Sequence, residues 1–174
     1  KFNLNHYSKN GSKLYMLETP YSVFNQEEQS YTLNKTNIKF FNEEDIKYNV
    51  NSDSAKLQNN KFLELKGNVE INDFNNNKTI IKSNNLYWNI DKSEFILEGN
   101  VLLVNNIIKL SSNKASFDKK DDIITFFNPI KYNYTDKDGI RRYNISSENA
   151  YYNISTKDVI FKSKNDKVKS KLFF

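Results

Sequence analysis

The sequence repeats one short pattern five times, with starts 29 to 35 residues apart. Each copy has Ser or Thr, two residues, a small or aliphatic residue, one residue, a bulky apolar residue, and then Asn, Asp or Gln. The copies are TPYSVFN, SDSAKLQ, SNNLYWN, SNKASFD and SENAYYN, which begin at Thr19, Ser52, Ser83, Ser112 and Ser147. A fixed period of this length is typical of folds that stack one supersecondary unit many times.

Within each unit the side chains alternate with a period of two, which predicts β-strands. In the fourth copy, for example, Ser112, Lys114 and Ser116 alternate with Ala115 and Phe117. A polar turn such as NIDKSE or NISTKD follows the motif, and a second alternating strand follows the turn. Each unit is therefore predicted to be a β-hairpin. A single hairpin cannot bury its apolar face, so the hairpins must stack on one another.

The returning strands contain a second repeated feature, LKGNV at residues 65–69 and LEGNV at residues 97–101. Gly67 and Gly99 fall on the apolar face of their strands, where a missing side chain permits a bulge or a sharp bend. We predict that both glycines are structural corners, and that Asn128 and Pro129 form the corner of the next unit. The fold expected from these patterns is an all-β sandwich, jelly roll or solenoid with an apolar interior running along the stack.

Composition excludes several classes of function. The net charge of +5 is spread along the chain, whereas nucleic-acid binding needs a concentrated basic surface, so no nucleic-acid partner is expected. The chain has no Cys and one histidine, His6, so a His/Cys zinc site or a Ser-His-Asp triad is not expected. Paired acidic residues fall in polar, turn-like stretches. We therefore predict a protein without enzymatic activity, metal or cofactor.

The ordered series of motifs resembles the OstA-like repeat of lipopolysaccharide-transport proteins, and LptC in particular. The resemblance is carried by residues 6–41, by the second and third motif copies and by the two GNV corners, and it extends more loosely to Ile160. It implies a twisted, open β-jellyroll of stacked bent hairpins, with residues 1–174 as a single periplasmic OstA-like domain. The chain departs from the family pattern at Asn128 and Pro129, and its fifth unit lacks a recognisable corner at residues 162–166.

The resemblance also implies a function. A protein of this family is expected to hold the lipid A acyl chains of lipopolysaccharide in an apolar groove, without catalysis. It would pass the lipid from the inner-membrane ABC transporter toward LptA and the outer membrane. The apolar stripes of the hairpins supply candidate groove residues, although each of them is also an ordinary core position. These candidates are Leu65, Val69, Ile71, Leu86, Trp88, Leu97, Val101, Leu103 and Phe117.

Partners and location are likewise expectations from the resemblance. The exposed N-terminal strand edge, with Phe2 and Leu4, is expected to face the transporter subunits LptF and LptG. The C-terminal edge, with Val168 and Leu172, is expected to continue into an LptA-like protein. The domain would lie in the periplasm, tethered to the inner membrane by an N-terminal helix outside this sequence.

Two alternative interpretations remain open at this point. The chain has features that also fit LptA or the OstA-like N-terminal domain of LptD. An alternative of another class is a β-solenoid scaffold or adhesion module with a closed core. An open apolar trough would favour a lipid carrier, whereas a filled interior would favour a scaffold.

Overall fold

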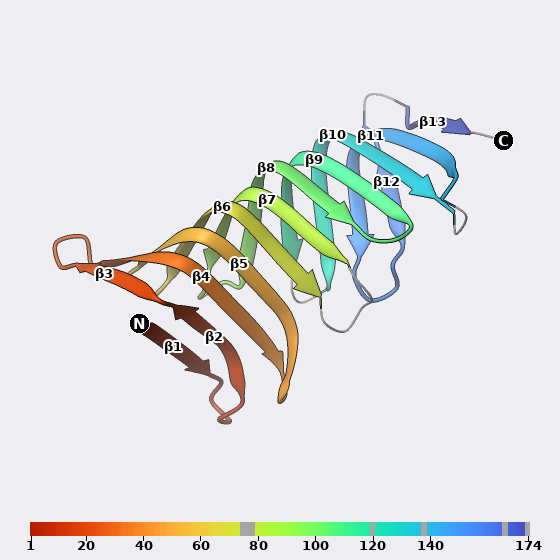
Figure 1. The fold of residues 1–174 in the computed structure, drawn as a ribbon. Coiled ribbons are helices and arrows are strands. Elements are labelled where there is room, and N and C mark those ends of the chain that lie inside the picture. Colours follow the sequence, from red (N-terminus) through yellow and green to blue (C-terminus); the bar gives the residue numbers. More distant parts are fainter. Residues whose placement is uncertain (74–78, 119–120, 137–138, 165–166, 173–174) are drawn as a thin grey trace.

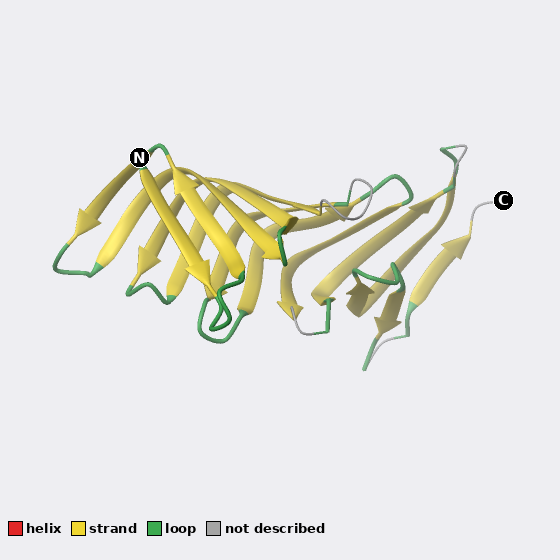
Figure 2. Cartoon of the chain, turned by 90° about the horizontal axis from the view of Figure 1, so that it is seen from below, coloured by secondary structure: helices red, strands yellow, loops and turns green. Residues whose placement is uncertain are grey.

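A computed structural model describes residues 1–73, 79–118, 121–136, 139–164 and 167–172, and these residues contain strands but no helix (Figure 2). The strands form one antiparallel sheet in which β1, β2 and β4 to β12 follow one another in chain order. β3 pairs with β4, and β13 pairs with β11. The strands are β1 Phe2–Tyr7, β2 Lys13–Thr19, β3 Tyr21–Asn25, β4 Ser30–Asn42, β5 Asp45–Gln58, β6 Phe62–Asp73, β7 Ile80–Asn89, β8 Glu94–Val104, β9 Ile108–Asp118, β10 Ile123–Thr135, β11 Arg141–Asn153, β12 Val159–Lys162 and β13 Lys169–Leu172. The all-β jellyroll expected from the sequence is confirmed.

The long strands bend near their middle, so that the sheet arches over along a line of corners (Figure 1). The half of the sheet that carries the repeated motifs is called here the motif limb, and its described residues lie within 21–34, 54–66, 85–98, 114–127 and 149–162. The other half is called the opposite limb, and its described residues lie within 2–19, 36–51, 69–82, 101–112, 130–147 and 169–172. Each limb ends in hairpin turns. The line where turns of the two limbs approach each other is called the seam.

Gly67 and Gly99 occupy equivalent corners on β6 and β8. Each glycine and the asparagine after it have positive φ, with values of 73° and 44° at the first corner and 77° and 50° at the second. Both corners insert an extra residue against the neighbouring strand, which is the definition of a β-bulge. A Cβ on Gly67 would lie 2.6 Å from Asp53 Oδ2, and one on Gly99 would lie 2.8 Å from Asn84 Nδ2. The duplicated GNV sequence therefore encodes the same bend twice.

The third corner bends the strand without glycine. β10 changes register between Phe127 and Ile130 against β11, and between Phe127 and Lys131 against β9. The Gly-Asn corners show the same shift in register, with one extra residue on the bent strand. Pro129 fits here because proline donates no backbone hydrogen bond, and the ladder is interrupted at a bulge. The departure from the family pattern at Asn128 and Pro129 therefore preserves the bend.

At both ends of the sheet, a break into two short strands takes the place of a bend. β2 and β3 are separated at Pro20 and pair with successive parts of β4. β12 and β13 pair with successive parts of β11, so the fifth unit is also divided into two strands. Of the stretch 162–166 that lacks a recognisable corner in the sequence, residues 165 and 166 lie outside the described residues. On the second of these breaks, the backbone N–H of Glu148 donates to Ser163 Oγ, and that of Lys164 donates to Glu148 Oε2.

The first residue of every motif copy has the same structural role. Its hydroxyl donates a hydrogen bond to the backbone carbonyl two residues further on, at the bend where the strand ladder is interrupted. The Oγ-to-O distances are 2.9 Å for Thr19 to Tyr21, 3.0 Å for Ser52 to Ser54, 2.9 Å for Ser83 to Asn85, 2.8 Å for Ser112 to Lys114 and 2.9 Å for Ser147 to Asn149. A hydroxyl that bonds a nearby backbone carbonyl favours a local bend over a regular ladder, which explains the repeated Ser or Thr.

Within the described residues, the last residue of the motif is seen to shape the turn that follows in the first, third and fifth copies. Its side-chain Oδ1 accepts hydrogen bonds from backbone N–H groups two or three residues ahead, as in an Asx turn. The bonds run to Asn25 from Glu27 and Glu28, to Asn89 from Lys92, and to Asn153 from Ser155 and Thr156. The motif thus encodes a bend at its start and a turn at its end.

Replacing Gly67 or Gly99 by Val is expected to lower the free energy of unfolding by about 1–3 kcal/mol, because a β-branched residue is strained at positive φ. Gly67→Asn is the matched control, since Asn adds the same Cβ but tolerates the left-handed conformation. Urea denaturation of the variants measures the difference. Equal costs for Val and Asn would show that crowding against Asp53, and not backbone strain, is what requires glycine.

Candidate functional site

The alternation of the strands places one apolar column on the inner face of the motif limb. The bulky sixth residues of the motif copies form this column, and they are Phe24, Leu57, Trp88, Phe117 and Tyr152. Leu57 and Tyr152 are fully buried, whereas Phe24 near the N-terminal end is half exposed. The small fourth residues, such as Ala115 and Ala150, lie next to them and are also buried. The alternation of small and bulky residues in the motif thus shapes the interior.

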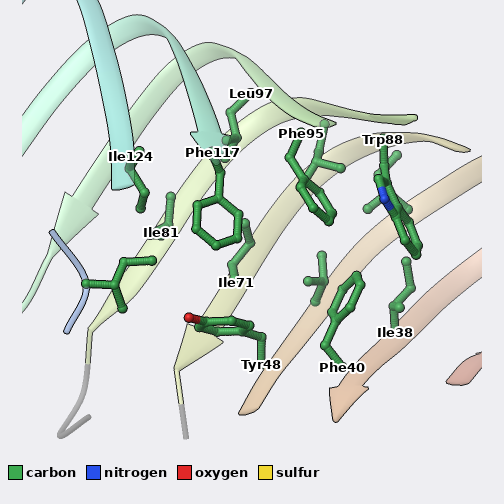
Figure 3. Close-up of a pocket in the computed structure, with 14 residues that line it drawn as sticks. Ile38, Phe40, Tyr48, Ile71, Ile81, Trp88, Phe95, Leu97, Phe117 and Ile124 are labelled. Atoms are coloured by element: carbon green, nitrogen blue, oxygen red, sulfur yellow. The ribbon is translucent and has the colours of Figure 1, made fainter. Parts of the chain in front are cut away.

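The two limbs enclose a small cavity of about 40 Å³ (Figure 3). All of the lining residues are aliphatic or aromatic. They are Ile38, Phe40, Tyr48, Val50, Leu65, Ile71, Ile81, Leu86, Trp88, Leu97, Phe95, Phe117, Ile124 and Ile154. Pockets that hold small ligands usually measure about 300–1,000 Å³, so this cavity has the composition but not the size of a lipid site.

Aromatic side chains close the interior by contacts between the limbs. Phe40 of the opposite limb lies with its ring centroid 5.0 Å from that of Trp88 and 5.8 Å from that of Phe95. Further along, Tyr48 and Phe117 meet at 6.1 Å. All three pairs have edge-to-face geometry, which is favourable for aromatic rings. The limbs are therefore packed together, and a larger ligand requires them to separate.

Of the nine candidate groove residues, six line the cavity: Leu65, Ile71, Leu86, Trp88, Leu97 and Phe117. The other three, Val69, Val101 and Leu103, are buried but do not line it. Val69 and Val101 directly follow the Gly-Asn corners, so they pack where the limbs diverge. The alternation of the strands predicts that all nine side chains lie on the inner face of the sheet. It does not show how far along its strand each residue lies from the bend.

Eight lining residues were not among the candidates. Ile38, Phe40, Tyr48 and Val50 come from the opposite limb on β4 and β5, and Ile81 comes from β7. Phe95 and Ile124 share the apolar parity of their strands, so the same alternation could have identified them. Ile154 lies in the turn after β11, where no periodic signal exists.

Within the described residues, short strands that pair on one side only flank the sheet at both ends. Phe2 and Leu4 lie on β1, which pairs with β2 alone among the described residues. Leu172 lies on β13 and is 60% exposed, whereas Val168 precedes that strand and takes no part in its pairing. The last two residues of the predicted C-terminal edge, 173 and 174, lie outside the described residues.

The fold and the interior define a class of protein, namely an all-β folded meander with an apolar interior between its two limbs. A sequence model of the family "Lipopolysaccharide-assembly, LptC-related" matches residues 1–103, which is more than half of the chain. The chain belongs to this family, and its role therefore lies in lipopolysaccharide assembly.

Other comparisons add little. The chain matches no curated protein sequence. Among solved structures it is similar to the crystal structure of LptH from Pseudomonas aeruginosa, described as the LptA-homologous periplasmic component of the conserved lipopolysaccharide transport device. The two chains are 6% identical, and the alignment covers 91% of this chain and 94% of that one with a TM-score of 0.34. This overlap is too loose to support an inference about function.

Proposed function

We propose that the protein is a non-catalytic carrier that holds the acyl chains of lipopolysaccharide between its two limbs. The observation that carries this proposal is the cavity, whose lining consists of aliphatic and aromatic side chains drawn from both limbs. Burial of acyl chains there is favoured by about 25 cal/mol per Å² of apolar surface removed from water. Membership of a lipopolysaccharide-assembly family supports lipopolysaccharide as the lipid whose chains would be bound.

The carrier would act as one segment of a bridge. We propose that the edge of β1, with Phe2 and Leu4, meets the inner-membrane transporter subunits LptF and LptG. The edge of β13, with Leu172, would meet an LptA-like protein. An unpaired strand edge offers backbone donors and acceptors to a further strand, and the two edges lie at opposite ends of the sheet (Figure 1). Residues 1–174 would form one periplasmic domain.

The location relative to the membrane is part of the same proposal. Within the described residues, no helix is long and apolar enough to span a bilayer. We propose that the domain lies in the periplasm and that an N-terminal helix tethers it to the inner membrane.

The small volume of the cavity supports a second candidate, a scaffold with a closed core. A cavity of about 40 Å³ is well below the roughly 300–1,000 Å³ of pockets that hold small ligands. A scaffold needs nothing more from its interior than this packing. A carrier needs the limbs to separate when lipid binds. The two proposals therefore differ in whether lipid reaches the inner face.

Photo-crosslinking tests the carrier proposal. A photoreactive amino acid at Phe117 or Leu86, which line the cavity, is expected to capture lipopolysaccharide in cells. The matched control is Ser116, the neighbour of Phe117 on the other face of β9, and a second control is Lys92 in the exposed turn after β7. Capture at the inner positions and none at the controls is expected. No capture at either inner position would favour the scaffold.

A further inference from the structure

The seam is closed by an ion pair between residues 75 positions apart in the sequence. Lys47 Nζ, at the start of β5 on the opposite limb, lies 3.0 Å and 3.2 Å from the two carboxylate oxygens of Asp122. Asp122 lies in the turn before β10 on the motif limb, and it also accepts a hydrogen bond from Ser155 Oγ at 3.2 Å. About a quarter of each charged side chain is exposed, so solvent screens the pair only in part.

A second ion pair crosses the seam beside the first. Lys157 Nζ, in the turn after β11, lies 3.8 Å from Asp73 Oδ2 at the end of β6, and the Asp73 side chain is 8% exposed. Burial lowers the pKa of Lys157, and the carboxylates of Asp73 and Asp122 act in the opposite direction. Both carboxylates therefore influence this lysine. We call Lys47, Asp73, Asp122 and Lys157 together the seam cluster.

The seam cluster lies at the edge of the apolar interior. Tyr48, the residue after Lys47, lines the main cavity. It also lines a second, smaller cavity together with Asp73, Tyr152 and Ile154. Burial, together with the Asp122 and Asp73 carboxylates, raises the pKa of Tyr48, so its hydroxyl stays neutral between the apolar cavity and the charges. The cluster is thus placed where the polar part of an amphipathic lipid would lie if its chains entered the cavity.

The charges of the cluster suit exchange of partners. Its two lysines and two carboxylates balance each other, so the closed seam carries no net charge from these four residues. A phosphate would offer charge-assisted hydrogen bonds to both lysines. Such bonds are stronger than the longer of the two existing ion pairs, which joins Lys157 and Asp73 at 3.8 Å. Phosphate would also repel the two carboxylates, and this repulsion would push apart the two limbs that carry them.

We propose that the seam cluster is a phosphate-responsive closure of the interior. The limbs separate along the seam, acyl chains enter from the side, and the phosphates of the lipid replace Asp122 and Asp73 as partners of Lys47 and Lys157. This inference rests on the proposed carrier function, because it concerns the same interior. It adds the route of entry, the residues that control entry and the headgroup chemistry that releases them.

A covalent bridge across the seam tests the route of entry. Lys47→Cys with Asp122→Cys gives a unique thiol pair, because the chain has no cysteine, and a cleavable bismaleimide can join the two thiols. Capture of purified lipopolysaccharide by a photoreactive residue at Phe117 is expected to fall about tenfold or more in the bridged protein and to recover after cleavage. The control pair is Lys61→Cys with Asp91→Cys, whose native side chains lie 3.4 Å apart in neighbouring turns of the motif limb.

The outcomes separate the two proposals. Equal capture by the bridged and cleaved forms would show that lipid does not enter through the seam, while leaving the carrier function intact. No capture by either form or by the control pair would overturn the carrier function itself and the seam proposal with it.

A second experiment tests the exchange of partners. Asp73→Asn with Asp122→Asn and Lys47→Gln with Lys157→Gln both remove the two ion pairs. Capture of phosphorylated lipid A is expected to rise several-fold in the first variant and to fall several-fold in the second, whereas dephosphorylated lipid A should not distinguish them. Circular dichroism establishes that both variants are folded. If both variants capture phosphorylated lipid A equally, the lysines do not bind phosphate and the proposal is wrong.

Discussion

Arginine in place of Val101 is expected to unfold the protein. Val101 is 0% exposed and directly follows the second Gly-Asn corner, where the two limbs join and cannot separate. An arginine there has no buried partner and no short route to water. The cost of an unpaired buried charge is on the order of 4–5 kcal/mol or more, against a total stability of about 5–15 kcal/mol for a typical domain. Circular dichroism and thermal melting measure the loss.

Phe117→Arg is the matched control for this prediction. Phe117 is partly buried, lines the cavity and lies near the seam end of β9, so an arginine there can extend its charged group toward water along the seam. We expect this variant to stay folded but to lose capture of lipid at Leu86. A Val101→Arg protein that melts like the wild type would show that the corner region is accessible to water. In that case the interior would be an open trough along its whole depth.

Trp88→Ala is expected to cost about 3–5 kcal/mol in the free energy of unfolding. Trp88 is 5% exposed, and its ring contacts both limbs, with centroid distances of 4.8 Å to Tyr15, 5.0 Å to Phe40 and 5.3 Å to Phe95. Removing the indole therefore leaves a cavity and also breaks the aromatic contacts that join the limbs. Urea denaturation followed by circular dichroism measures the change.

The matched control is Trp88→Phe, expected to cost less than about 1.5 kcal/mol. A smaller aromatic ring keeps most of the packing, and the indole Nε1 makes no hydrogen bond within the described part of the chain. If the Ala and Phe variants lost the same stability, an unrecognised polar interaction of the indole would be responsible, and the contacts between the limbs would be less important than we infer.

The repeat in the sequence predicted the strands, the hairpins and the corners because these depend on local chemistry. Alternation with a period of two identifies which side chains face inward, and the Gly-Asn pairs identify the bends. Leu86, Trp88 and Phe117 were found by this reasoning alone. Their partners across the interior were not, because the twist of the sheet decides which part of the opposite limb meets each copy of the motif.

Lys47 and Asp122 show the limit most clearly. Each lies in or next to a polar turn, and in the sequence alone each is indistinguishable from an ordinary solvated charge. They lie 75 residues apart, which is not a multiple of the 29 to 35 residues that separate the motif copies. The pairing arises from folding the sheet, so it becomes visible only when the two limbs are placed together.

Contacts between the limbs also determine how the molecule holds together as a whole. A row of hairpins that touched only their immediate neighbours would melt piecemeal from its two ends, as linear repeat arrays do. Here Tyr15 reaches Trp88, and Asp73 reaches Lys157, so units several repeats apart are coupled. The closed molecule should therefore unfold as one cooperative body. Separation of the limbs would remove this coupling. In the empty protein the aromatic side chains hold the limbs together, whereas in the lipid-filled protein the bound lipid would have to do so.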